Sequence, residues 1–274
     1  MIKTKNLTLV SKDNIQYIQF PKLSRCGCVR HIFSTRHGGV SSGDCAAMNL
    51  GFSRGDAREN VLKNYEILCS QVGIDTENLV LSHQTHTKNI KSVTYKHRGT
   101  GITKPSFCDV DGLVTNVSGV ALVTQYADCT PLLFCDPVKK VIATSHAGWR
   151  GTVKLIGKET VQKMCDDYGC KPENIIAGIG PCIRNCCYEV DEPVYSEFCK
   201  IPFLNPDDVF TSKSNGRYML DLVEANRLIL LEAGILPENI DASDICTCCN
   251  CEDLHSHRAT QGKRGNLAAI IELI

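Results

Sequence analysis

Histidine and cysteine side chains stand at the ends of short apolar runs in this sequence. A strand end holds a side chain in a fixed direction while the following turn leaves it accessible, so reactive groups concentrate at such ends. Three of these side chains each follow a different run: His86 after Leu79–Ser82, Cys129 after Val120–Gln125, and His146 after Val141–Ser145. We therefore treat them as one candidate site.

Two imidazoles and one thiolate form a ligand set that suits zinc or copper. Three protein ligands beside an open position are typical of catalytic zinc, which makes water reactive at neutral pH. The separations between His86, Cys129 and His146 match no local motif. From these residues alone, two other interpretations stay open. One is a core cysteine with two hydrogen-bonded histidines, and the other is a cysteine hydrolase with a Cys129/His146 nucleophilic pair.

The overall composition excludes several classes of protein. The 274 residues are 43% hydrophobic and 22% charged, which is typical of a globular chain and excludes wholesale disorder. Thirty basic residues balance 30 acidic ones, so the chain lacks the basic excess expected of a nucleic-acid-coating protein. Since it has no uncharged apolar run of about 18 residues, we expect no membrane span.

The first residues show neither the apolar stretch nor the small-residue cleavage site of a secretion signal, so we expect a cytoplasmic protein. In that reducing compartment, 17 irregularly spaced cysteines favour free thiols and metal ligands over a disulfide framework. Four thiols within Cys246–Cys251 could bind zinc or Cu(I). A closed zinc site usually takes pairs from two separated segments, and no second segment is evident. Free thiols are therefore favoured there, and also at Cys26, Cys28, Cys186 and Cys187.

Helical periodicity marks three segments that would flank the strands. One begins near Asp56 with Glu59 at the capping-box spacing, one covers Gly151–Tyr168, and one begins at Asp221. Short apolar runs predict the strands Leu79–Ser82, Gly112–Thr115, Val120–Gln125, Pro131–Cys135, Val141–Ser145, Ile175–Ile179 and Leu267–Leu273.

The spacing of two strands also predicts the sheet type. The short gap between Val120–Gln125 and Pro131–Cys135 favours a hairpin, so the sheet should not be all parallel. The chain has no long linker and no repeat that would separate domains. We therefore predict a single α/β (α+β) domain over residues 1–274 with mixed β-sheets.

A series of motifs along the chain occurs in the order found in one known family. The most specific are Ala127-Asp128-Cys129-Thr130-Pro131 and His146-Ala147-Gly148-Trp149-Arg150-Gly151; others are Gln84-Thr85-His86, Asp109-Val110-Asp111-Gly112-Leu113, Gly180-Pro181-Cys182-Ile183, Cys187-Tyr188-Glu189-Val190 and Ser256-His257-Arg258. Over about residues 30–272 the chain resembles the laccase-type multicopper polyphenol oxidases, a family now described as purine nucleoside phosphorylases.

The resemblance implies helices layered around central mixed sheets, with a zinc ion held by His86, Cys129 and His146 as the catalytic site. It implies phosphorolysis of adenosine, inosine, guanosine and methylthioadenosine, together with deamination of adenosine. The partners would be purine nucleosides and phosphate, with no nucleic acid and no membrane, and the protein would be a monomer or a homodimer. Copper in place of zinc and copper-dependent oxidation of phenols stay as the alternative, and a metal-buffering protein is the non-enzymatic one.

Four further residues are candidates for substrate binding. Arg150 and Arg258 lie in motifs named above, and Arg36 lies in a further matching segment, Phe33–Ser41. A guanidinium group can bind phosphate or ribose with two hydrogen bonds. Asn49 is a candidate contact to the sugar or to phosphate.

The chain departs from the family pattern at two places that could bind an anion. Relatives usually carry Asn-Arg where this chain has Asn64-Tyr65, and Thr-Gly-Arg where it has Arg264-Gly265-Asn266. We expect Arg264 to compensate from two positions earlier. Neither departure touches the three predicted ligands.

Overall fold

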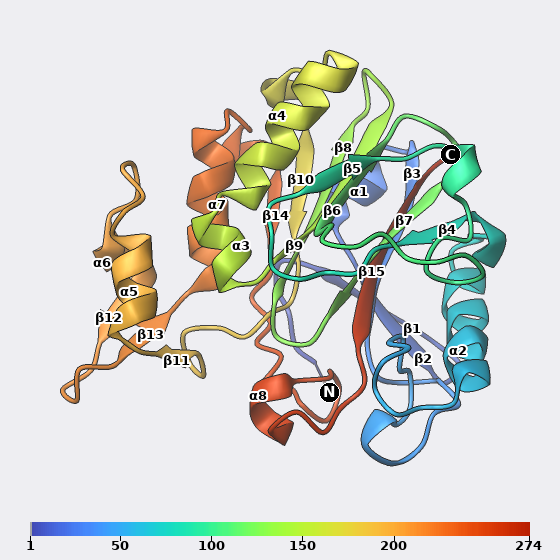
Figure 1. The fold of residues 1–274 in the computed structure, drawn as a ribbon, viewed down its shortest axis with the longest axis horizontal. Coiled ribbons are helices and arrows are strands. Elements are labelled where there is room, and N and C mark those ends of the chain that lie inside the picture. Colours follow the sequence, from blue (N-terminus) through green and yellow to red (C-terminus); the bar gives the residue numbers. More distant parts are fainter. Residues whose placement is uncertain (1) are drawn as a thin grey trace.

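Two six-stranded sheets packed face to face form the centre of the molecule, which the computed structural model describes over residues 2–274 (Figure 1). The first sheet has the order β1 (Thr8–Lys12), β2 (Ile15–Gln19), β3 (Val29–Ser34), β15 (Leu267–Leu273), β7 (Ala121–Tyr126), β4 (Leu79–Leu81). The second has the order β14 (Ile240–Ala242), β10 (Ile176–Ile179), β8 (Thr130–Asp136), β9 (Val141–Ala147), β6 (Gly112–Thr115), β5 (Ile90–Ser92). A small antiparallel sheet has the order β11 (Glu189–Val190), β13 (Tyr218–Leu220), β12 (Phe210–Ser212).

Both large sheets are mixed, as the sequence predicted. In the first, β4 runs parallel to β7 while the other neighbours are antiparallel. In the second, β10 and β14 are parallel, as are β5 and β6, and the remaining pairs are antiparallel. The predicted hairpin is wrong, because β7 and β8 belong to different sheets. The chain between them crosses from one sheet to the other, and Cys129 lies in this crossing.

Helices cover the outer faces of the two sheets (Figure 1), which confirms the predicted layering. The longer ones are α2 (Arg58–Ser70) on the first sheet, and α4 (Ile156–Tyr168) and α7 (Leu222–Glu232) on the second. The short ones are α1 (Pro21–Arg25), α3 (Trp149–Val153), α5 (Glu192–Phe198), α6 (Pro206–Val209) and α8 (His257–Thr260). Single 3-10 turns occupy Gly43–Cys45, Thr76–Asn78, Tyr95–His97, Pro172–Asn174 and Pro237–Asn239.

The central strands are buried on both faces, and β8 illustrates how. Leu132 and Phe134 pack toward the helices, while Leu133 and Cys135 pack toward the opposite sheet. Successive side chains of a strand point to opposite faces, so a strand covered on both sides consists of a continuous apolar run. For this reason these strands could be predicted from the sequence.

Two of the three predicted helices differ from the structure: one begins later than predicted, and the other is divided into two helices. The first begins at Arg58 with Ala57 at its N-cap, because the Asp56 carboxylate accepts hydrogen bonds from side chains of the neighbouring loop instead. The segment predicted as one helix over Gly151–Tyr168 is α3 and α4, separated where Leu155 adopts a left-handed φ of 61°. The third helix follows Asp221 as predicted, with its carboxylate capping the first turn.

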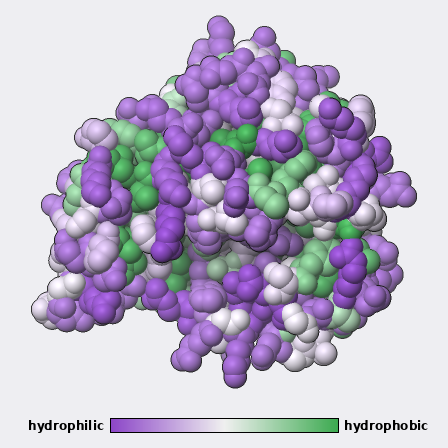
Figure 2. Space-filling model, in the orientation of Figure 1, coloured by the Kyte–Doolittle hydropathy of each residue, from purple (hydrophilic) through white to green (hydrophobic). Residues whose placement is uncertain are grey.

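The surface shown in Figure 2 is mostly hydrophilic, with small hydrophobic patches. Large exposed apolar side chains are scattered along the chain: Val40, Tyr95, Val138, Leu236 and Ile274. Within residues 2–274, none of the helices has the length and apolar character needed to cross a bilayer.

Candidate metal centre

The structure brings His86, Cys129 and His146 together from three separate segments. One ligand atom of each residue lies within 4.8 Å of the others. The Cys129 Sγ is 3.8 Å from His86 Nε2, and the two imidazole rings meet edge to face with their centroids 4.9 Å apart. His86 follows β4, Cys129 lies between β7 and β8, and His146 is on β9, so the site spans both large sheets.

Asp111 holds two of these side chains in place, and the sequence interpretation did not identify this role. Its fully buried carboxylate accepts a hydrogen bond from His146 Nδ1 at 2.8 Å, which leaves His146 Nε2 to face the site. The same carboxylate accepts the backbone N–H groups of Thr85, His86 and Thr87 at 3.1, 3.0 and 2.8 Å. His86 itself has a left-handed φ of 64°, so these bonds stabilise an unfavourable backbone conformation. The sequence feature that could have indicated this role is the position of Asp111 directly before the buried strand β6.

The charges of the site favour a thiolate at neutral pH. Burial raises the pKa of Cys129, but the positive charge of His146 and the hydrogen bonds from both histidines outweigh it and lower that pKa to about 6. Burial lowers the pKa of His146, but the Cys129 thiolate and Asp111 outweigh it and raise that pKa to about 9. The thiolate is the form of cysteine that binds a metal.

Gly148 lies directly against the proposed ligands. A Cβ atom there would be 2.7 Å from His86 Cδ2 and 2.9 Å from Cys129 Sγ. Its backbone φ of −65° is open to any residue, so the space between the ligands is what requires glycine. This explains the glycine in the His146-Ala147-Gly148 motif physically.

Two cavities meet at the His-Cys-His group. One has a volume of about 190 Å³ and a polar lining that includes Arg54, Gln84 and His146. The other has a volume of about 410 Å³, and its lining includes Trp149, Ile183, Tyr188, Leu222, Arg150 and Arg258. His86, Cys129 and Arg264 line both. The donor set therefore fits zinc or copper chemically, and its surroundings are open to small molecules from two sides.

Arg54 and Arg264 give the smaller cavity positive charge. The Arg264 Nε is shielded from solvent and has no hydrogen-bond partner within residues 2–274. Burial and the nearby Arg54 guanidinium lower the pKa of Arg264 to about 10. Two guanidinium groups that line the same cavity make it a suitable place for an anion. Arg54 was not identified from the sequence.

The four predicted substrate residues divide into two groups. Arg150 and Arg258 line the larger cavity, where their guanidinium groups lie 4.3 Å from the Trp149 ring centroid and 5.3 Å from the Tyr188 ring centroid. Arg258 also donates to the carbonyl oxygens of Cys187 and Glu189, at 3.0 and 3.1 Å.

Arg36 and Asn49 do not reach either cavity. The Arg36 guanidinium donates to the carbonyl oxygens of Ala46 and Cys251 at 2.6–2.8 Å. The Asn49 side chain is fully buried and bonds the backbone of Gly51 and Asn266. The structure thus gives both residues a role in holding loops together, in contrast to the expected substrate contacts.

The two departures from the family pattern have separate outcomes. Tyr65 is buried and donates to the Leu50 carbonyl at 2.9 Å, so no cation stands at that position. Arg264 donates to the Asn266 side chain and lines both cavities, which places a guanidinium at the site as expected.

Comparison with known proteins gives consistent matches over most of the chain. A family described as multi-copper polyphenol oxidoreductase laccase matches residues 30–274. Purine nucleoside phosphorylase YlmD of Bacillus subtilis (strain 168) is 37% identical over 241 residues, 87% of this chain and 86% of that protein. A protein named adenosine deaminase, from an unknown prokaryotic organism, is 34% identical over 229 residues, 82% and 87% of the two chains. The crystal structure of YlmD from Geobacillus stearothermophilus is similar with a TM-score of 0.90 at 34% identity, covering 97% and 98% of the two chains.

Proposed function

The chain belongs to the multi-copper polyphenol oxidoreductase laccase family, and from that premise we propose that it is a metal-dependent purine nucleoside phosphorylase that also deaminates adenosine. Relatives named purine nucleoside phosphorylase and adenosine deaminase support an enzyme acting on purine nucleosides. The observation that carries the proposal is the position of the His-Cys-His group between an aromatic cavity and a guanidinium-lined one.

The larger cavity suits the purine. Trp149 and Tyr188 offer aromatic surface, and Ile183 and Leu222 add apolar surface. Flat heteroaromatic bases stack on such side chains, as nucleobases do on aromatic platforms. Purine nucleosides of either the 6-amino or the 6-oxo type have the flat ring that this lining requires.

The smaller cavity suits phosphate. Phosphorolysis breaks the N-glycosidic bond while phosphate forms a new bond to the anomeric carbon, so a phosphate anion must lie beside the sugar. Arg264 lines both cavities, and Arg54 adds a second positive charge to the smaller one. These two guanidinium groups would hold the phosphate where the cavities meet.

His86, Cys129 and His146 would hold the metal, with zinc as the proposed ion. A zinc ion so placed supplies Lewis-acid chemistry, which suits both activation of water for deamination and polarisation of a purine. Asp111 keeps His146 in the tautomer that turns Nε2 to the site and anchors the backbone of His86. Because Asp111 acts on the site through His146 and the backbone of His86, it is a positioning residue.

The Cys129/His146 pair also has the thiolate character of a cysteine nucleophile. His86 Nε2 lies 3.8 Å from the same sulfur. A cysteine–histidine nucleophilic pair does not need this second histidine, whereas a metal site needs a third ligand. A metal site is therefore the better interpretation of the group as a whole.

The test is an assay of purified, zinc-loaded protein with inosine, guanosine, methylthioadenosine and adenosine, with and without phosphate. We expect release of the free base to depend on phosphate, and conversion of adenosine to inosine to proceed without phosphate. Separate His86→Ala, Cys129→Ser and His146→Ala variants should each lose at least about 100-fold in both rates. The exposed cysteine variant Cys108→Ser serves as the matched control and should keep them.

Absence of product from every nucleoside, with folded and metal-loaded protein, would refute the proposal. Oxygen consumption with a phenol and Cu(II), lost in the Cys129→Ser variant, would instead favour the copper oxidase.

A further inference from the structure

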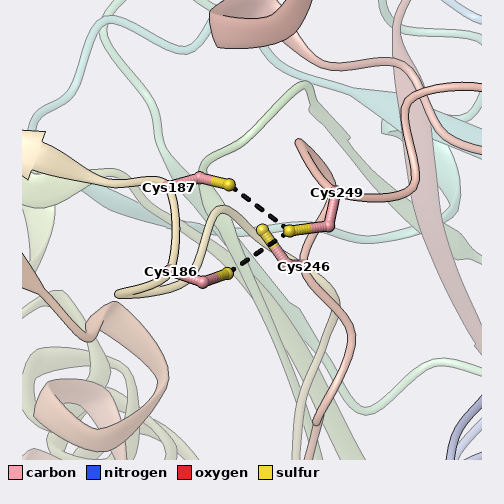
Figure 3. A group of neighbouring side chains, drawn as sticks. All are labelled: Cys186, Cys187, Cys246 and Cys249. Carbon is pink, nitrogen blue, oxygen red and sulfur yellow. Dashed lines mark hydrogen bonds between the residues drawn. The ribbon is translucent and has the colours of Figure 1, made fainter.

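Four cysteines gather at a second place, away from the His-Cys-His group. The sulfur atoms of Cys186, Cys187, Cys246 and Cys249 all lie within 4.8 Å of one another (Figure 3). The Cys249 Sγ is 3.4 Å from that of Cys186 and 3.3 Å from that of Cys187. In Figure 3 the four side chains point into one common space from two different loops.

The topology explains why two distant loops supply these thiols. β10 and β14 are neighbouring parallel strands, so their carboxyl ends meet at the same edge of the sheet. The chain after β10 and the chain after β14 continue side by side, with Cys182 and Cys246 still paired in parallel. Cys186 and Cys187 lie in the first continuation, and Cys246 and Cys249 in the second.

The four sulfur atoms lie close enough together to bind one metal ion. With Zn–S bonds of about 2.3 Å, the sulfurs of a tetrahedral site lie roughly 3.8 Å apart. A multi-iron cluster binds each cysteine to its own iron and so spreads the sulfurs farther. A disulfide would join one pair at about 2.05 Å, whereas Cys249 here is nearly equidistant from two partners.

The backbone around the cluster also suits bound thiolates. The Arg184 N–H donates to Cys246 Sγ at 3.4 Å. Such an N–H donor supports metal-bound sulfur from outside the coordination sphere. The Cys246-Thr247-Cys248-Cys249 spacing lets one turn present two sulfurs to one ion, as zinc knuckles do.

We propose that Cys186, Cys187, Cys246 and Cys249 bind a structural zinc ion in a closed four-thiolate site. Four thiolates in a tetrahedral arrangement are the ligand set that zinc prefers for structural sites. The sequence interpretation found only the Cys246–Cys251 half and favoured free thiols, because the second pair lies about sixty residues earlier in the chain.

This zinc would fix one wall of the larger cavity. Tyr188 is next to Cys187 in the chain and lines that cavity, and Arg258 lines it while donating to the Cys187 carbonyl at 3.0 Å. On the other loop, Thr247 donates to Asp128 at 2.6 Å, directly before Cys129. A zinc that joins the two loops would thus hold the aromatic lining beside the His-Cys-His group.

The experiment uses the variant His86→Ala/Cys129→Ser/His146→Ala, which lacks the ligands of the first site. The protein is produced in medium containing zinc and purified by gel filtration, and the zinc bound per chain is then measured. We expect one zinc per chain, bound by four sulfurs at about 2.3 Å in X-ray absorption. Adding Cys246→Ser and Cys249→Ser should remove this zinc. Adding Cys248→Ser and Cys251→Ser, from the same loop but outside the cluster, should leave it in place, and so should Cys26→Ser with Cys28→Ser.

A measurement on the unaltered protein covers the case in which a variant does not fold. With both sites filled, X-ray absorption should give a sulfur-rich average environment, whereas the His-Cys-His site alone would give twice as much nitrogen as sulfur. Loss of all zinc from a folded first variant, zinc that survives Cys246→Ser with Cys249→Ser, or a nitrogen-rich environment in the unaltered protein would each overturn the proposal.

Discussion

Asp111 supports two ligands of the proposed metal centre, because its carboxylate accepts hydrogen bonds from the His146 side chain and from the backbone N–H of His86. Replacing Asp111 should change the position of two ligands, His86 and His146, without removing any of the three metal ligands. We predict that Asp111→Asn weakens zinc binding by about 10- to 100-fold, the usual effect of removing a hydrogen-bond partner of a metal-bound histidine. Competition with a chromophoric chelator measures the Kd. Asp208→Asn, at an exposed carboxylate in α6, is the control, and equal affinity in the two variants would contradict the prediction.

Gly148 makes a second prediction for a single residue. The methyl group of Gly148→Ala would meet His86 and Cys129 at less than 3 Å, so the two ligands must move apart. We expect lower zinc affinity and at least about 10-fold lower activity, while the backbone conformation stays accessible to alanine. Zinc titration followed by an activity assay checks this. Unchanged zinc affinity would show that the ligands have room that the structure does not give them.

Arg264 carries the prediction for the anion. We expect Arg264→Gln to raise KM for phosphate by about 10- to 100-fold, the scale of one charge-assisted hydrogen bond of about 1.5–3 kcal/mol. Deamination of adenosine needs no phosphate and should change much less. Steady-state kinetics at varied phosphate provide the measurement, with the exposed Arg217→Gln as control. A KM for phosphate equal to that of the control would place the anion elsewhere.

At the scale of elements, a buried histidine joins β3 to the start of α1. His31 Nε2 accepts the Phe20 N–H at 2.9 Å, and burial lowers the pKa of His31 to about 4. A lowered pKa means that the unfolded chain, with its histidine near 6.5, binds the proton more strongly. The contribution to stability is therefore complete above pH 6.5 and is lost as the pH falls from there toward 4.

The expected size of this effect follows from the two pKa values. A difference of about 2.5 pKa units corresponds to roughly 3 kcal/mol of unfolding free energy. Urea denaturation of the protein and of His31→Gln at several pH values isolates it, since the other titrating groups are common to both. If the two proteins lose stability in parallel between pH 6.5 and 4, His31 is not protonated on unfolding.

At the scale of the whole molecule, both proposed metal sites join segments that are far apart in the chain. The first joins the two large sheets, and the second joins the loops after β10 and β14. A ligand that binds only the folded state stabilises it by about 2.7 kcal/mol at 100 times its Kd. We predict that zinc raises the Tm of the chelator-treated protein in two separable steps, one abolished by Cys129→Ser and the other by Cys249→Ser. Magnesium, which prefers oxygen ligands, should leave the Tm unchanged.

Much of this architecture could be predicted from local sequence. Strands buried on both faces, such as β8 and β15, appear as continuous apolar runs, and the aspartate before α7 marks its beginning. Edge strands such as β1 and β11 lack such a signal, because most of their side chains are exposed or only partly buried. A left-handed residue at Leu155 divides a continuous helical pattern, since periodicity carries no information about the backbone angle of one residue.

The sequence by itself determined the residue types of the site, the family resemblance and the mixed α/β class, because these depend on motifs and local hydrophobic periodicity. Tertiary structure alone decided which groups meet. It brought Cys186 and Cys187 to Cys246 and Cys249, and it turned Arg36 and Asn49 toward backbone partners and away from the cavities. The physical reason is that strand order and register set which chain ends are neighbours, and both arise from packing between segments that no local pattern connects.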